Sequence, residues 1–320
     1  LCGVIWIDTL KPQDLSFSFL AGKPVSLIAT AVFFMSIALN AKKIAAPNKK
    51  FPIFLLITFM AWITLTTYYA EFQSNAWYKH SYSIKTILLT LFIPFVLNSR
   101  LKLETCIAVI VAAVSYYTTI GGVRTLLGQG QYGAYLVQTS AGNSGLAETS
   151  TLAMVSVMII PLIIYLLKYS ELIQKAPILK PYLYALIFAS IVTCIGTYAR
   201  TGLVGLFVLL FIGFLNVKNK LKPALLAFFA LIILAIFAPQ DWKDRMGTIQ
   251  TANQDQSALG RLVVWRWTLD YVSERPFLGG GFDAYKANAG ELNAYQEAGD
   301  AVLNMASTQK SKAFHSIFFE

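Results

Sequence analysis

Three side chains in the second half of the chain have the types and settings for phosphate and proton chemistry. Arg200 lies in a short polar turn between two apolar runs, Arg261 in a long hydrophilic segment, and His315 where that segment becomes apolar again. A guanidinium is a planar fork of donors that suits phosphate oxygens, and a neutral imidazole can accept a hydroxyl proton without a metal. The set predicts a site for a diphosphate and a hydroxyl group.

Each of these side chains also has a structural interpretation. Arg200 is equally consistent with a cation that reaches lipid headgroups, and Arg261 with a solvated helix charge like its neighbour Arg266. His315 alone is typical of a structural residue at a membrane interface. Trp265, four residues after Arg261 and on the same helix face, is typical of an interface anchor.

The strongly apolar composition indicates which kind of secondary structure positions these three residues. Of the 320 residues, 56% are hydrophobic and 13% are charged, whereas soluble domains average about 25% charged. The net charge of +10 comes from cations in short clusters between apolar runs, the pattern that sets membrane orientation, so a nucleic-acid partner is not expected. The sequence predicts an all-α, polytopic integral membrane protein whose solvent is the lipid bilayer.

The apolar runs define the predicted helices, because without water the hydrocarbon core admits only helices of about 20 residues. Residues 1–238 are predicted to be a transmembrane region with a truncated first span at 1–7, 239–314 a periplasmic loop, and 315–320 the start of a further truncated span. The eight complete spans are expected at 25–41, 51–70, 82–98, 103–120, 149–167, 181–197, 201–215 and 223–238.

The short connectors differ in charge in a way that predicts the topology. Every second connector is rich in Lys and Arg, and these connectors together hold twelve cations, whereas the remaining connectors together hold five. The cation-rich connectors are therefore expected to be cytoplasmic. The first set is Lys42, Lys43, Lys49, Lys50, Arg100, Lys102, Lys168, Lys175, Lys180, Lys218, Lys220 and Lys222, and the second is Lys11, Lys23, Lys79, Arg124 and Arg200.

Residues 181–215 are nearly continuous apolar sequence, interrupted at 197–201. A single helix would be roughly 50 Å long against a hydrocarbon core of roughly 30 Å, and it would place two lysine clusters on opposite membrane faces. Two spans joined by a very tight outward turn are therefore predicted, with Arg200 at the outer surface.

Two outward segments remain. The loop 239–314 is expected to hold a helix from Ala258 to about Glu274, with Ser257 as N-cap and Pro276 as the stop, followed by a flexible glycine turn at 279–281. The loop 121–148 is rich in Gly, Ser, Asn and Gln and has Arg124 as its only cation.

No metal or other cofactor is expected. The outward loops lack an Asp-x-Asp motif or a histidine cluster that would hold Mg²⁺ or Zn²⁺. Cys2, Cys106 and Cys194 fall inside apolar runs without paired spacing, and each is predicted to be a small buried apolar residue.

Four short motifs follow one another in a fixed order on this predicted topology. They are Thr197-Tyr198-Ala199-Arg200-Thr201-Gly202, Ser257-Ala258-Leu259-Gly260-Arg261 with Trp265, Pro276 with Gly279 to Phe282, and Phe314-His315-Ser316. In this order they resemble the O-antigen ligase-like family of lipid-linked-glycan ligases and polymerases. The turn Leu10-Lys11-Pro12 and the span pattern resemble the O-glycosylation ligases associated with exosortase systems.

The resemblance implies a GT-C-like transmembrane bundle in the bacterial inner membrane, with an active site that faces the periplasm. In that family, arginines like Arg200 and Arg261 hold the diphosphate of an undecaprenyl-diphosphate-linked glycan, and a histidine like His315 activates an acceptor hydroxyl on a lipid, glycan or protein. Arg124 and Trp265 are expected in the same cavity. The implied transfer inverts the anomeric carbon and needs neither nucleotide nor metal.

Three other functions are alternatives for the same sequence. A transporter or flippase for an anionic lipid or polysaccharide would use the arginines for binding alone, and an O-antigen polymerase would share the family and the site. A sensor or scaffold would leave Arg200, Arg261 and His315 without a shared location. The ligase interpretation requires these three side chains around one outward-facing cavity.

Overall fold

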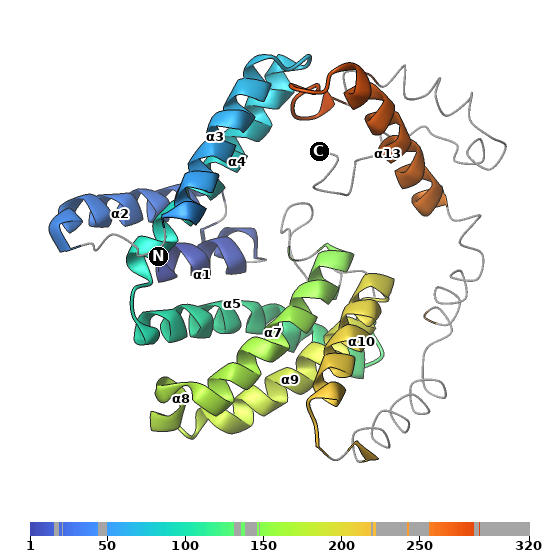
Figure 1. Ribbon diagram of the computed structural model, residues 1–320. Helices are drawn as coiled ribbons and strands as arrows, with labels where there is room; N and C mark the ends of the chain where they lie inside the picture. The colour runs from blue at the N-terminus through green and yellow to red at the C-terminus, as the bar shows by residue number, and fades with distance from the viewer. Residues whose placement is uncertain are drawn as a thin grey trace. The chain divides into compact units, whose positions relative to one another are not determined.

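The computed structural model describes residues 1–15, 19–20, 22–43, 50–130, 136–137, 146, 148–218, 220–221, 242, 256–284 and 288. These residues form helices and turns without a β-strand, which confirms the predicted all-α class (Figure 1). The helices are α1 (Cys2–Leu10), α2 (Val25–Leu39), α3 (Phe51–Tyr68), α4 (Gln73–Val96), α5 (Arg100–Leu126), α7 (Thr149–Tyr169), α8 (Glu171–Lys175), α9 (Leu179–Gly196), α10 (Arg200–Leu215) and α13 (Gln256–Glu274), with short 3₁₀ turns at Pro12–Asp14 and Ala41–Lys43.

The predicted spans correspond to observed helices from α2 to α10. The helices α3, α5, α7 and α9 are long and apolar enough to cross a membrane, and α2 and α10 are shorter apolar helices. The chain is therefore a multi-pass membrane protein. The predicted span 223–238 lies outside the described residues.

Helix α4 begins at Gln73, nine residues before the predicted start at residue 82. Its first turns are too polar for an apolar window to find, but local side-chain bonds support them. Trp77 Nε1 donates to Gln73 Oε1 at 2.9 Å, and His80 Nε2 lies 2.9 Å from Thr64 Oγ1 on α3.

Contacts divide the chain into two compact units. Unit 1 comprises Leu1–Ala45 and Phe95–Lys243, and unit 2 comprises Ala46–Pro94 and Asp244–Glu320. Each unit is described by itself below.

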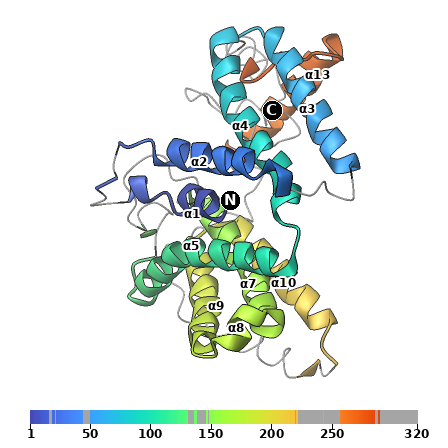
Figure 2. The ribbon, with the colours of Figure 1, turned by 90° about the vertical axis from the view of Figure 1, so that its left-hand side faces the viewer.

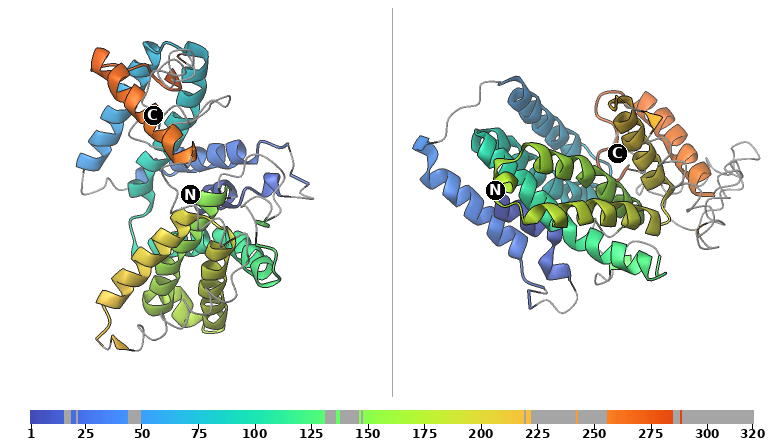
Figure 3. Two further views of the ribbon diagram at one scale, coloured as in Figure 1. Left: turned by 90° about the vertical axis from the view of Figure 1, so that its right-hand side faces the viewer. Right: turned by 90° about the horizontal axis from the view of Figure 1, so that it is seen from below.

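The centre of unit 1 is a bundle of α5, α7 and α9, with α10 on α7 and α1 along α5 (Figure 2, Figure 3). On α5, the segment near Gly121 and Gly122 approaches Thr193 and Ala189 on α9 so closely that a Cβ there would be crowded. The apolar core of these three helices is Val111, Val114, Ile159, Ile163, Leu166, Leu183 and Leu186, together with Ile173 from α8. Cys106 and Cys194 are buried as predicted, and Cys2 is half-buried.

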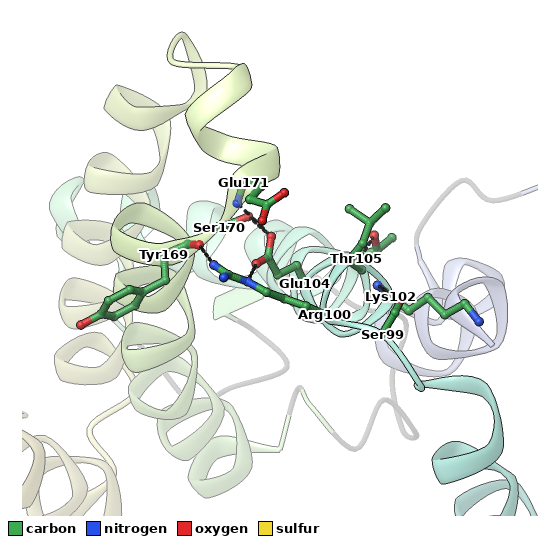
Figure 4. A network of polar contacts seen from close by, with 9 residues as sticks. Ser99, Arg100, Lys102, Glu104, Thr105, Tyr169, Ser170 and Glu171 are labelled. Carbon is green, nitrogen blue, oxygen red and sulfur yellow. Dashed lines mark hydrogen bonds and ion pairs between the residues drawn. The ribbon is translucent and has the colours of Figure 1, made fainter. Parts of the chain in front are cut away.

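A buried carboxylate joins the start of α5 to the junction of α7 and α8 (Figure 4). Glu104 is 1% exposed and accepts hydrogen bonds from Arg100 Nε at 2.8 Å, Ser170 Oγ at 3.0 Å and the Glu171 amide at 2.9 Å. Arg100 also donates to the Tyr169 carbonyl at 2.5 Å. The connectors before α5 and after α7 therefore lie at one end of unit 1, as the charge pattern predicts.

The run 181–215 forms two helices, as predicted. Helix α9 ends at Gly196, α10 begins at Arg200, and Tyr198 between them adopts a left-handed conformation with φ of 56°. Residues early in α10 pack on the end of α9, and Leu206, further along, packs in a cluster that includes Ile191 and Ile187. The chain therefore reverses direction at the turn.

Unit 2 is built on the α3–α4 hairpin, with α13 and the segment 275–284 packed at its turn. The Glu71 amide donates to the Gly280 carbonyl at 3.3 Å, although the two residues are far apart in sequence. Helix α13 ends at Glu274, before Pro276, as predicted, but it already includes Gln256, so Ser257 lies inside the helix rather than at its N-cap.

Candidate functional site

Arg200 is the first residue of α10, and the preceding turn is held by buried hydroxyl bonds. Thr197 is fully buried, its hydroxyl donates to the Cys194 carbonyl at 2.8 Å, and it accepts from the Ala199 amide at 3.3 Å. Alanine at the N-cap offers no side-chain acceptor to the first turn. The turn therefore presents a half-buried guanidinium together with the partial positive charge of a helix N-terminus, which favours phosphate.

Two glycines let this turn sit between neighbouring helices. A Cβ at Gly196 would overlap the side chain of Thr125 on α5, and one at Gly202 would lie 2.5 Å from Ala153 Cβ and 2.8 Å from Cys194 Sγ. Neither position has room for a side chain. The place of Arg200 is therefore fixed by close helix packing on both sides of the turn.

We expect Gly202→Ala to lower the free energy of unfolding by about 1–3 kcal/mol, because the new methyl group overpacks the α7–α9–α10 contact. The matched control is Gly213→Ala on the same helix, where a Cβ meets nothing within 4 Å. That control is expected to stabilise by about 0.5–1 kcal/mol. Thermal unfolding of the two variants in detergent micelles measures the difference, and equal shifts would contradict close packing at the turn.

Arg124 lies in the last turn of α5, at the same end of unit 1 as Arg200. Its guanidinium donates to the Leu136 carbonyl at 3.4 Å. Thr125, the next residue, meets Gly196, which stands four residues before Arg200. The structure thus places Arg124 and Arg200, two of the residues predicted to line the cavity, at the same end of the bundle.

The other predicted residues belong to unit 2. Arg261 is on α13, one turn before Val264 and Trp265, and its side chain lies outside the described part of the structure. Trp265 is half-buried. His315 also lies outside the described residues, so the convergence of Arg200, Arg261 and His315 on one cavity stays a prediction.

A cavity of about 870 Å³ lies within unit 2 between α3, α4 and α13. One part of its wall is polar, with Lys79 and the backbone of the glycine turn 279–281, and another is apolar, with Phe59, Ile63 and Ile87. Among the described residues, no group of three His, Cys, Asp or Glu side chains could hold a metal ion.

Glu71, in the turn between α3 and α4, is a functional candidate that the sequence did not reveal. Its carboxylate pairs with Arg275 at 2.9 Å and accepts from the Asn288 amide at 2.6 Å. Burial alone would raise the pKa of Glu71, but Asn288, Tyr271 and Arg275 together lower it below its ordinary value. Burial and the neighbouring Glu71 carboxylate raise the pKa of Tyr271.

Asp283 makes a second polar contact between the same parts of unit 2. It is 2% exposed, has φ of 59°, and lies 3.8 Å from Lys79 Nζ on α4. The sequence gives no sign of the partners of Glu71 and Asp283, because each partner is more than 200 residues away along the chain.

Two family models match this multi-pass, all-α membrane protein. One, described as O-antigen ligase, matches residues 185–320, and the other, described as a family of unknown function (DUF5935), matches residues 1–171. No curated protein and no solved structure gives a match. The chain belongs to the family of unknown function, whose model covers more than half of it, and its residues 185–320 form a domain of the O-antigen ligase-like family. The exosortase-associated subgroup stays a prediction.

Proposed function

We propose that the protein transfers an oligo- or polysaccharide from an undecaprenyl-diphosphate carrier to an acceptor hydroxyl at the periplasmic face of the bacterial inner membrane. The observation that carries this proposal is the O-antigen ligase match, which spans Arg200, Arg261 and His315. A transporter would explain the cations, but it would not explain the family match.

Arg200 and Arg261 are proposed to bind the diphosphate of the donor. The setting of Arg200 supports this role, because a guanidinium and a helix N-terminus both favour phosphate oxygens. Arg124 would add charge at the same end of unit 1, and Trp265 would contribute an aromatic wall beside Arg261.

His315 is proposed as the general base. It takes the proton of the acceptor hydroxyl while the oxygen attacks the anomeric carbon, so that a new carbon–oxygen bond forms with inversion. The bond from that carbon to the diphosphate breaks, and the diphosphate leaves with the bonding electrons. Arginines stabilise the negative charge that develops on the leaving group, so the reaction needs neither nucleotide nor metal.

Reconstitution into proteoliposomes tests this function. Purified protein is incubated with an undecaprenyl-diphosphate-linked glycan and lipid, glycan or peptide hydroxyl acceptors, without nucleotide and with EDTA. Glycan transfer with release of undecaprenyl diphosphate is expected. Movement of the intact donor across the bilayer without a new bond would contradict the ligase proposal and favour the transporter.

The membrane orientation is a separate prediction. In a variant whose Cys2 is replaced by serine, single cysteines at Lys102, Lys175 or Lys220 should be protected from an impermeant maleimide added to spheroplasts. A cysteine at Phe277, which is 80% exposed, should react from outside. Labelling of position 220 from outside would contradict the predicted topology.

A further inference from the structure

Two sets of polar contacts between distant parts of the sequence join the α3–α4 hairpin to the end of α13 and the segment after it. We call Glu71, Lys79, Arg275, Asp283 and Asn288 the polar anchor. A single carboxylate, that of Glu71, binds both Arg275 and Asn288, while Asp283 faces Lys79. The polar anchor thus attaches both the last turn of α13 and the segment after it to the hairpin.

Close backbone contacts reinforce these polar ones. A Cβ at Gly281, whose φ is 74°, would overlap Ala70, and a Cβ at Gly280 would lie 2.6 Å from the Tyr271 hydroxyl. Tyr271 stacks on Trp267 and lies under the Arg275 guanidinium at 4.3 Å. The glycine turn therefore packs closely against Ala70 and Tyr271, in addition to connecting α13 to the segment that follows it.

The polar anchor stands at one end of α13, and Arg261 lies toward the other end. In Figure 1, α13 meets α3 and α4 near their shared turn and diverges from them toward its start. Arg261 precedes Tyr271 by ten residues, a rise of about 15 Å along a helix. A small rotation at the polar anchor therefore becomes a displacement of several ångströms at Arg261.

We propose that the polar anchor positions α13 so that Arg261 can bind the donor diphosphate. Glu71, Arg275, Lys79 and Asp283 are then positioning residues that do not touch the substrate. This inference rests on the proposed function, because Arg261 is a donor-binding residue only in that account.

Amide hydrogen exchange tests the positioning directly, on the full chain in lipid nanodiscs. The Glu71 and Arg275 side chains are partly exposed, and such ion pairs contribute little to global stability, so Glu71→Gln should fold. Peptides covering 262–284 should exchange roughly fivefold faster in Glu71→Gln than in the wild type, the effect expected from one partly exposed pair. Exposed Glu274 supplies the matched control, and Glu274→Gln should leave exchange unchanged.

A variant in which Glu71 and Arg275 exchange their charges distinguishes loss of the ion pair from other effects of the substitution. In the double variant Glu71→Arg, Arg275→Glu the ion pair can re-form, and the Asn288 amide can rotate to present its oxygen to the new arginine. Exchange over 262–284 should return toward the wild-type rate. Wild-type exchange in Glu71→Gln, or a double variant no slower than the single one, would overturn the anchor.

Steady-state transfer then tests the link to the donor. Glu71→Gln should raise KM for the undecaprenyl-diphosphate donor several-fold and lower kcat as well, because Arg261 is proposed both to bind the donor and to stabilise the leaving diphosphate. Faster exchange with an unchanged donor KM would overturn the link to Arg261. If the wild type transfers no glycan, the proposed function fails, while the exchange measurements still decide whether the polar anchor holds α13.

Discussion

Replacing His315 with alanine is expected to lower turnover by about 100- to 10,000-fold, the usual contribution of a general base. Without the imidazole, no group in the proposed mechanism takes the acceptor proton as the new bond forms. Folding and donor binding should stay nearly unchanged. Initial rates at saturating donor in proteoliposomes measure the effect, with donor binding and thermal unfolding as controls.

The pH profile identifies the protonation state that His315 requires. Because only neutral imidazole accepts a proton, the wild-type rate should rise with pH as the imidazole loses its proton, and EDTA should have no effect. The residual rate of His315→Ala should lack this rise. Wild-type turnover with the same profile in His315→Ala would leave the histidine a structural role.

Replacing Arg200 or Arg261 with lysine is the second large effect that we expect. Lysine keeps the charge but loses the fork that binds two oxygens at once, and a hydrogen bond between charged groups contributes about 1.5–3 kcal/mol. Each single variant should therefore lose about tenfold to 100-fold in kcat/KM for the donor.

Arg266, exposed on the same helix as Arg261, supplies the matched control. Arg266→Lys should retain the wild-type kcat/KM, because its side chain has no role in the proposed site. Full activity in the double variant Arg200→Lys, Arg261→Lys would remove diphosphate binding by these residues from the mechanism.

Helix positions were predictable from the sequence because the bilayer restricts both length and composition. The break between α9 and α10 followed from the length of 181–215, and the end of α13 followed from Pro276. The early start of α4 was not predictable, because its polar residues are stabilised by contacts such as Thr64 with His80. A helical turn that is stabilised by polar side-chain contacts does not produce an apolar run in the sequence.

The residues of the candidate site divide in the same way. Arg200, Arg261 and His315 were proposed from their types and a family resemblance, and the structure adds that Arg200 lies at a turn between closely packed helices. Glu104 and Glu71 were not found, because Ser170, which binds Glu104, and Asn288, which binds Glu71, are 66 and 217 residues away from them. Pairings across such distances are set by tertiary packing, which a single sequence does not specify.

The central claim is that this chain breaks the bond between glycan and diphosphate and joins the glycan to an acceptor oxygen. Its most direct test is transfer to an acceptor whose hydroxyl carries ¹⁸O, with mass spectrometry of both products. The mechanism predicts ¹⁸O in the new glycosidic bond and none in the released undecaprenyl diphosphate. Label in the diphosphate, or consumption of the donor without ¹⁸O in the glycan product, would contradict attack by the acceptor at the anomeric carbon.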